Sequence, residues 1–195
     1  QPPRDQDRCE DKHEFEGFRA VNDHWLDNFA IFTALKERDQ ERVWSDWPQD
    51  LRDRNPGAMA AIRAELRDAV ERIEFIQFLA FRQWHALKFY CNQRGISMVG
   101  DIPIYVSYDG ADVWANSEIF KLDENKKPTH VSGVPPDYFS ATGQLWGNPV
   151  YNWEVCKQSE FHWWRRRMGH MLSLFDIVRI DHLRGLVAYW EVPAG

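Results

Sequence analysis

The strongest constraint on the fold is a pair of short apolar segments separated by helical and loop-like sequence. ISMVGDIPIYV (96–106) and FDIVRIDHL (175–183) are rich in β-branched residues, as strands covered on both faces are. A helical pattern precedes each of them, over 69–94 and over 161–174. The order of helix, strand, long excursion, helix and strand predicts an α/β fold with a parallel sheet and helical crossovers.

Apolar residues recurring every three or four positions predict two helices before the first strand, and we expect one face of each to be buried. These faces comprise Val21, Trp25, Phe29, Phe32 and Leu35 in the first helix, and Val70, Ile73, Ile76, Ala80, Trp84 and Leu87 in the second. Pro48, Pro56 and Gly57 predict turns or the start of a further helix after Asn55, and Gly95 predicts a left-handed C-terminal cap.

Composition limits the classes of function. The chain has 195 residues, 28% of them charged, with a net charge of -6, which argues against a polyanion such as nucleic acid as partner. No apolar run approaches the ~18 residues needed to cross a bilayer. We therefore expect a soluble protein. Cys9, Cys91 and Cys156 lie far apart without metal or disulfide spacing, which indicates a reducing, cytoplasmic setting.

Both predicted strands lead into acidic residues, Asp101 after ISMVG and Asp181 after IVRI, and Pro103 marks where ladder pairing should end. In β/α barrels the functional groups stand at the carboxyl ends of the strands, so the two acids indicate a site. A complete barrel takes about 250 residues, and only two convincing strands are present. We therefore expect the chain to be part of a longer protein.

Asp181 is the strongest candidate for a catalytic residue. Arg179 precedes it by two positions and so shares its face of the strand, where a guanidinium favours the charged carboxylate that a nucleophile needs. His182 and Arg184 add donors for sugar hydroxyls. A helix cap or a structural ion-pair network is the alternative interpretation of the same residues.

The excursion over 107–160 is long for a loop without function, and it is rich in Gly, Pro and aromatic residues. Tyr138 and Phe139 follow two prolines, and Trp146 is flanked by Gly and Pro, so these rings are candidates for binding a sugar face. The alternative is that they fill a core, since the chain is 14% aromatic with 10 Trp.

Other chemistries lack sequence support. His162, His170 and His182 do not have the spacing of a metal site, and neither phosphate-binding, dinucleotide-binding nor serine-hydrolase motifs occur. We expect neither a metal nor a cofactor.

Four segments together resemble the amylomaltases, the disproportionating 4-α-glucanotransferases. They are GDIPIYV (100–106), ADVWAN (111–116), GVPPDYFSATGQLWGNPVYNW (133–153) and VRIDHLRGLVAYWEVPAG (178–195). The similarity extends back through HWLDNFAIFTALKE and FRQWHALKFY, although the usual family form near Asp181 is closer to RIDHFRG than to RIDHLRG.

The resemblance implies an incomplete (β/α)8 TIM barrel, 1–195 being part of one catalytic domain and 107–160 a subdomain inserted between strands three and four. It implies a retaining transferase of α-1,4-glucans, with Asp181 as nucleophile at the end of strand four and Arg179 as its partner. Asp101 would fall at the end of strand three.

The same resemblance implies that His182 contacts the donor sugar and that Tyr138, Phe139 and Trp146 belong to a mobile aromatic loop guiding the glucan. The family's general acid/base Glu belongs after the next strand, and Glu191 matches a different acid. We therefore expect these residues to need the rest of the parent chain and to be inactive alone. An α-amylase-like hydrolase and a non-catalytic glucan-binding module are the alternatives.

Overall fold

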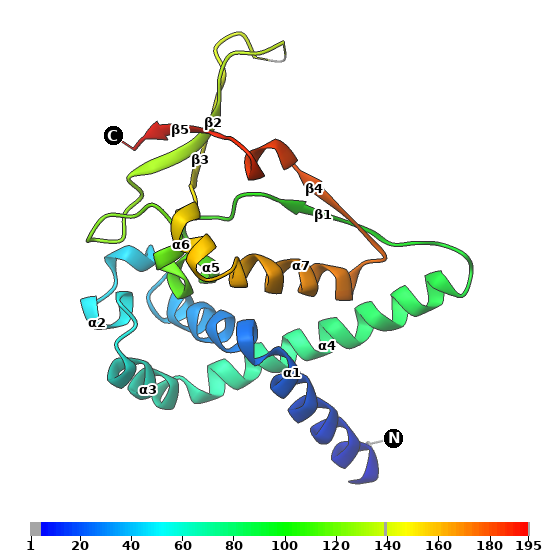
Figure 1. Cartoon of the computed structure of the whole chain (residues 1–195). Coiled ribbons are helices and arrows are strands. Elements are labelled where there is room, and N and C mark those ends of the chain that lie inside the picture. The colour runs from blue at the N-terminus through cyan, green and yellow to red at the C-terminus, as the bar shows by residue number, and fades with distance from the viewer. Residues whose placement is uncertain (1–4, 139, 195) are drawn as a thin grey trace. The chain divides into compact units, whose positions relative to one another are not determined.

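The computed structural model describes residues 5–138 and 140–194 and shows an α/β protein (Figure 1). The chain divides into two compact units, one up to Trp84 and one from His85 onward. The first unit is helical, and the second contains all the strands of the described residues.

The first unit contains α1 (Asp5–Arg38), η1 (Trp44–Asp46), α2 (Gln49–Arg52), α3 (Pro56–Glu65) and the start of α4 (Arg67–Asn92). The predicted start at Asn55 is confirmed, because its side chain accepts a hydrogen bond from the Gly57 amide at 3.0 Å and caps α3. The left-handed cap at Gly95 is also confirmed, with φ of +70° just beyond α4.

The predicted buried faces of the two long helices are correct only in part. Phe32 and Leu35 are buried, whereas Val21 is 74% exposed, and the buried stripe of α1 instead runs through Leu26 and Ala30. The stripe is displaced by one residue because the small Ala30 and Ala34 occupy its centre and Trp25 and Phe29 lie at its border.

On α4, two residues of the predicted face are buried, Val70 and Ile73. Ile76 and Leu87 are 49% and 48% exposed, and Phe78 is buried instead. The prediction of a face buried along the whole helix is therefore wrong.

The second unit continues with β1 (Val99–Pro103), α5 (Ala111–Ala115), η2 (Ser117–Ile119), β2 (His130–Val134), β3 (Gln144–Pro149), α6 (Trp153–Gln158), α7 (His162–Leu174), β4 (Ile177–Asp181), η3 (Leu183–Leu186) and β5 (Trp190–Pro193). β1 and β4 pair in parallel, from Val99 opposite Ile177 to Pro103 opposite Asp181. The predicted parallel pairing and its end at Pro103 are confirmed. A second, antiparallel sheet has the order β3-β2-β5.

The parallel pair has one covered and one open face. On β1, Gly100 and Ile102 are buried, whereas Val99, Asp101 and Pro103 are exposed. Gly100 is needed because a Cβ there would lie 2.3 Å from Cδ2 of Phe175. The open face carries Asp101, Arg179 and Asp181, so the alternation of the strands places the charged residues together.

Candidate functional site

Arg179 connects the two acids of the open face. Its Nη2 donates a hydrogen bond to Oδ1 of Asp181 at 2.6 Å, and its Nε lies 3.4 Å from Oδ1 of Asp101. The prediction that Arg179 and Asp181 share a face is confirmed. The hydrogen bond to Asp181, followed by the negative charges of Asp101 and Asp181, raises the pKa of Arg179 above its usual value.

The three side chains remain accessible to a ligand. The side chains of Asp101 and Asp181 are each 57% exposed and that of Arg179 is 64% exposed. Asp181 is the last residue of β4, as predicted, so its carboxylate stands at the carboxyl end of the parallel pair.

Asp101 does not follow its strand, and this prediction is wrong. Asp101 lies in the middle of β1, opposite Arg179. Pairing with β4 continues past Asp101 to Pro103, so Asp101 is two residues short of the strand's end. The strand starts only at Val99, where the preceding Ile96 amide donates to Cys91 O and the Met98 amide to the carboxylate of Asp176.

His182 and Trp146 lie together beside this cluster. The rings meet edge to face with centroids 5.0 Å apart, and the indole of Trp146 also donates to Oε1 of Gln144 at 3.0 Å. His182 adopts a left-handed conformation with φ of 52° and begins the turn η3. Thus β3, far from β4 in sequence, brings an aromatic side chain to the end of β4.

Of the two other predicted aromatics, the structure describes only Tyr138. Tyr138 is 97% exposed in the segment between β2 and β3, which projects beyond these strands in Figure 1. Phe139 lies outside the described residues.

Sequence reasoning did not identify Arg167 of α7 as a residue that binds the end of β1. Its guanidinium donates to the backbone carbonyls of Pro103 and Ile104 at 2.7 and 3.3 Å. Hydrogen bonds from a side chain to the backbone of a distant segment produce no recognisable spacing in the sequence. In addition, the three successive arginines Arg165–Arg167 do not reveal which of them makes these bonds.

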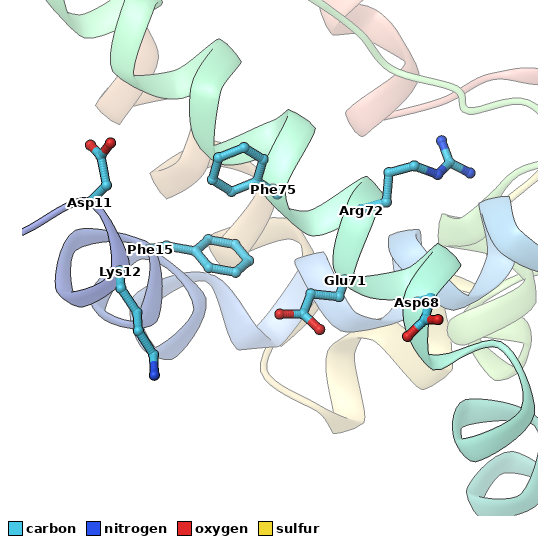
Figure 2. Close-up of a pocket in the computed structure, with 7 residues that line it drawn as sticks. All are labelled: Asp11, Lys12, Phe15, Asp68, Glu71, Arg72 and Phe75. Carbon is cyan, nitrogen blue, oxygen red and sulfur yellow. The ribbon is translucent and has the colours of Figure 1, made fainter. Parts of the chain in front are cut away.

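A separate groove lies on the helical unit between α1 and α4. It is lined by Asp11, Lys12, Phe15, Asp68, Glu71, Arg72 and Phe75 (Figure 2). Its two phenyl rings meet edge to face, with centroids 5.4 Å apart. Two of its charged groups have partners on other residues, since Asp11 accepts from Arg82 and Arg72 donates to Glu37, each at 2.6 Å. The groove therefore resembles the solvent-exposed surface of two packed helices.

Within residues 5–138 and 140–194, no three His, Cys, Asp or Glu side chains are grouped as metal ligands. No described helix has the length and apolar character that crossing a membrane requires.

Comparison with known proteins decides the family. The model of the 4-alpha-glucanotransferase family matches residues 3–195. The chain belongs to this family. The 4-alpha-glucanotransferase of Aquifex aeolicus is 49% identical over 180 residues, covering 92% of this chain and 37% of the relative. That of Thermus thermophilus is 48% identical over 185 residues, covering 95% and 37%.

A solved structure agrees with this membership of the 4-alpha-glucanotransferase family. Amylomaltase from Streptococcus agalactiae in complex with acarbose matches with a TM-score of 0.88 and 39% identity. The match covers 94% of this chain and 37% of that chain. The chain thus spans about 37% of the length of these relatives.

Proposed function

We propose that these residues form part of the catalytic domain of an amylomaltase-type 4-α-glucanotransferase. In this proposal β1 and β4 are neighbouring strands of a (β/α)8 barrel, and 107–160 is a subdomain inserted between them. The parallel pairing and the charges on its open face support this assignment, because barrel enzymes carry their site at the carboxyl ends of the strands.

The observation that carries the proposal is the Arg179–Asp181 pair at the end of β4. A carboxylate held at an open edge can attack the anomeric carbon of a bound glucan, forming a glycosyl ester while the glycosidic bond breaks and the leaving oxygen takes a proton from a general acid. The 4-hydroxyl of a second glucan then attacks the ester, loses its proton to the same group and releases Asp181.

The surrounding side chains fit contacts with sugar. In the proposal Asp101 and His182 hydrogen-bond to hydroxyls, and Trp146 offers a ring face. Tyr138 and Phe139 complete an aromatic loop that guides the glucan. An acceptor site that excludes water directs the intermediate to transfer instead of hydrolysis.

We assign the general acid/base to the rest of the parent enzyme. Glu191 of β5 is a poor candidate, since both of its carboxylate oxygens bind Nζ of Lys121, at 2.9 and 2.7 Å. The 195 residues alone are then expected to produce neither glucose nor longer oligosaccharides from maltotriose, as checked by chromatography of the products. Disproportionation by these residues alone contradicts the assignment.

The decisive experiment is Asp181→Asn in the parent enzyme, assayed with maltotriose. Loss of the nucleophile is expected to lower kcat by about 10⁴-fold or more. Asp68→Asn is the matched control, because Asp68 is an exposed residue at the start of α4 and should leave kcat unchanged. A non-catalytic glucan-binding module requires the opposite result, full activity in Asp181→Asn.

Product analysis separates transfer from the alternative of an α-amylase-like hydrolase. In transfer one reducing end disappears for each one formed, so their number stays nearly constant while chain lengths redistribute. In hydrolysis water takes the place of the acceptor and reducing ends accumulate. If reducing ends accumulate as fast as glucose is released, the result favours the hydrolase.

A further inference from the structure

The guanidinium of Arg167 binds the backbone at the end of β1, the strand that pairs with β4. Nη2 donates to Pro103 O at 2.7 Å, and Pro103 is the residue opposite Asp181 in the last pair of the ladder. Nη1 donates to Ile104 O at 3.3 Å. A planar guanidinium that donates to two successive carbonyls fixes the direction of the backbone where β1 ends.

The guanidinium is itself held from several sides. Its Cζ lies 5.2 Å from the ring centroids of both Trp163 and Trp164 of α7. Burial lowers the pKa of Arg167, and the charge of Asp112 acts in the opposite direction. Tyr151 donates to the same Ile104 carbonyl at 2.7 Å, so this peptide has two donors.

Ile104 connects this arrangement to the turn after the nucleophile. Its side chain is 2% exposed, and its Cδ1 would lie 2.6 Å from a Cβ added to Gly185. The same added Cβ would lie 2.9 Å from Cδ2 of His182. The turn that begins with His182 therefore rests directly on Ile104, without room for one further carbon atom.

We propose that Arg167 is a positioning residue for glycosyl transfer, which fixes Pro103 and Ile104 so that Asp181 and the His182 turn keep their productive geometry. This inference rests on the proposed function of Asp181. Arg167 contacts neither sugar nor reacting atoms in this role. A displacement of about 1 Å at a reacting group can cost about 100-fold in rate, which is why a remote support can control catalysis.

The test compares Arg167→Met and Arg167→Lys in the parent enzyme. Arg167→Met removes both donors, and we expect kcat to fall about 10- to 100-fold while KM for maltotriose changes less than about threefold. Lys keeps the charge but loses the planar guanidinium, so Arg167→Lys should recover part of the loss. Arg166→Met is the matched control, being an exposed arginine on the same helix, and should behave as the wild type.

Single-turnover release of fluoride from α-maltotriosyl fluoride gives a readout that altered folding does not explain. Fluoride departs without needing a proton from the general acid, so its release reports formation of the bond between Asp181 and the anomeric carbon. We expect Arg167→Met to slow release by the same factor as kcat, at a temperature at which its far-ultraviolet circular dichroism equals that of the wild type.

Wild-type kcat and fluoride release in folded Arg167→Met overturn the inference, as does a loss that only follows the fraction of unfolded protein. If Arg167→Met does not fold, Arg167→Lys decides, with reduced kcat in the folded protein supporting the inference and wild-type kcat refuting it. Asp181→Asn assayed in parallel separates the two proposals. Activity in Asp181→Asn refutes the proposed function, whereas its inactivity beside fully active Arg167 variants refutes only the positioning role.

Discussion

Trp146 of β3 lies against the turn that follows Asp181. Its ring contacts His182 edge to face, and 37% of the residue remains exposed. We expect Trp146→Ala in the parent enzyme to raise KM for maltotriose about tenfold, since an aromatic contact contributes about 1 kcal/mol beyond its buried area, with a smaller change in kcat. Trp146→Phe keeps a ring face and should stay within about threefold of the wild type. Unchanged initial-rate kinetics in Trp146→Ala would exclude its binding role.

Whether a contact between two side chains can be predicted from the sequence depends on whether the contact is local. The side chains of Arg179 and Asp181 meet because residues two apart share a strand face, a rule that applies before any tertiary structure is known. The meeting of Trp146 with His182 follows from how β3 and the turn after β4 come together, and no spacing encodes it. The bonds of Arg167 to backbone carbonyls are equally non-local.

Among the elements, β1 depends on close approach to Phe175, which lies two residues before β4. A Cβ at Gly100 would lie 2.3 Å from Phe175, so Gly100→Ala forces the ring or the strand to shift and should cost about 1–3 kcal/mol of unfolding free energy. Gly169→Ala on α7 is the matched control, because nothing lies within 4 Å of its added Cβ. It should be neutral or stabilise by up to about 1 kcal/mol. The midpoints of urea unfolding of the two variants test these expectations. Equal midpoints contradict the argument that Gly100 leaves no room for a Cβ beside Phe175.

Asp176 joins the end of α4 to the starts of β1 and β4. Its Oδ2 accepts from the Met98 amide at 2.7 Å and from Asn92 at 2.8 Å, and these bonds, with the charge of Lys88, lower the pKa of Asp176. A carboxyl whose pKa is lower in the folded state stabilises the fold above its unfolded pKa of about 4 and loses this contribution as pH falls through the folded pKa.

We therefore expect Asp176→Asn to lower the urea midpoint at pH 7, and the difference from the wild type to shrink as pH falls below about 4. Asp68→Asn serves as control, since no hydrogen bond to its carboxylate is present among the described contacts. A difference that stays constant from pH 7 to pH 3 excludes ionisation of Asp176 as its cause.

The limits of β1 illustrate why elements are predicted better than their ends. The apolar run 96–106 indicated a strand correctly. Gly95 and Pro103 gave reliable stop signals because glycine adopts the left-handed conformation without strain and proline lacks an amide donor, and both properties are intrinsic to the residue. The first strand residue was set instead by long-range competition for amides, with the Met98 amide taken by Asp176. Asp101 lies in the middle of the strand because the ladder continues past it to Pro103.

In the whole molecule, the open face of the parallel pair combines charge with apolar surface. Val99 and Ile177 are 63% and 55% exposed, and they stand opposite each other at the end of the ladder remote from Asp181. Parallel sheets are normally covered on both faces. Since relatives of this family are longer than the chain by a wide margin, we expect further parts of the parent enzyme to cover this surface.

The 195 residues expressed alone should then associate through this face. Size-exclusion chromatography with light scattering is expected to show species larger than a monomer, because two exposed apolar side chains and unpaired strand edges lie together. Replacing Val99 and Ile177 together by Thr keeps β-branched side chains while reducing apolar area, and should shift the distribution toward monomer. Val187→Thr is the control, since Val187 is 90% exposed outside the sheet and its replacement should change little. Equal association of both variants would place the contact elsewhere on the surface.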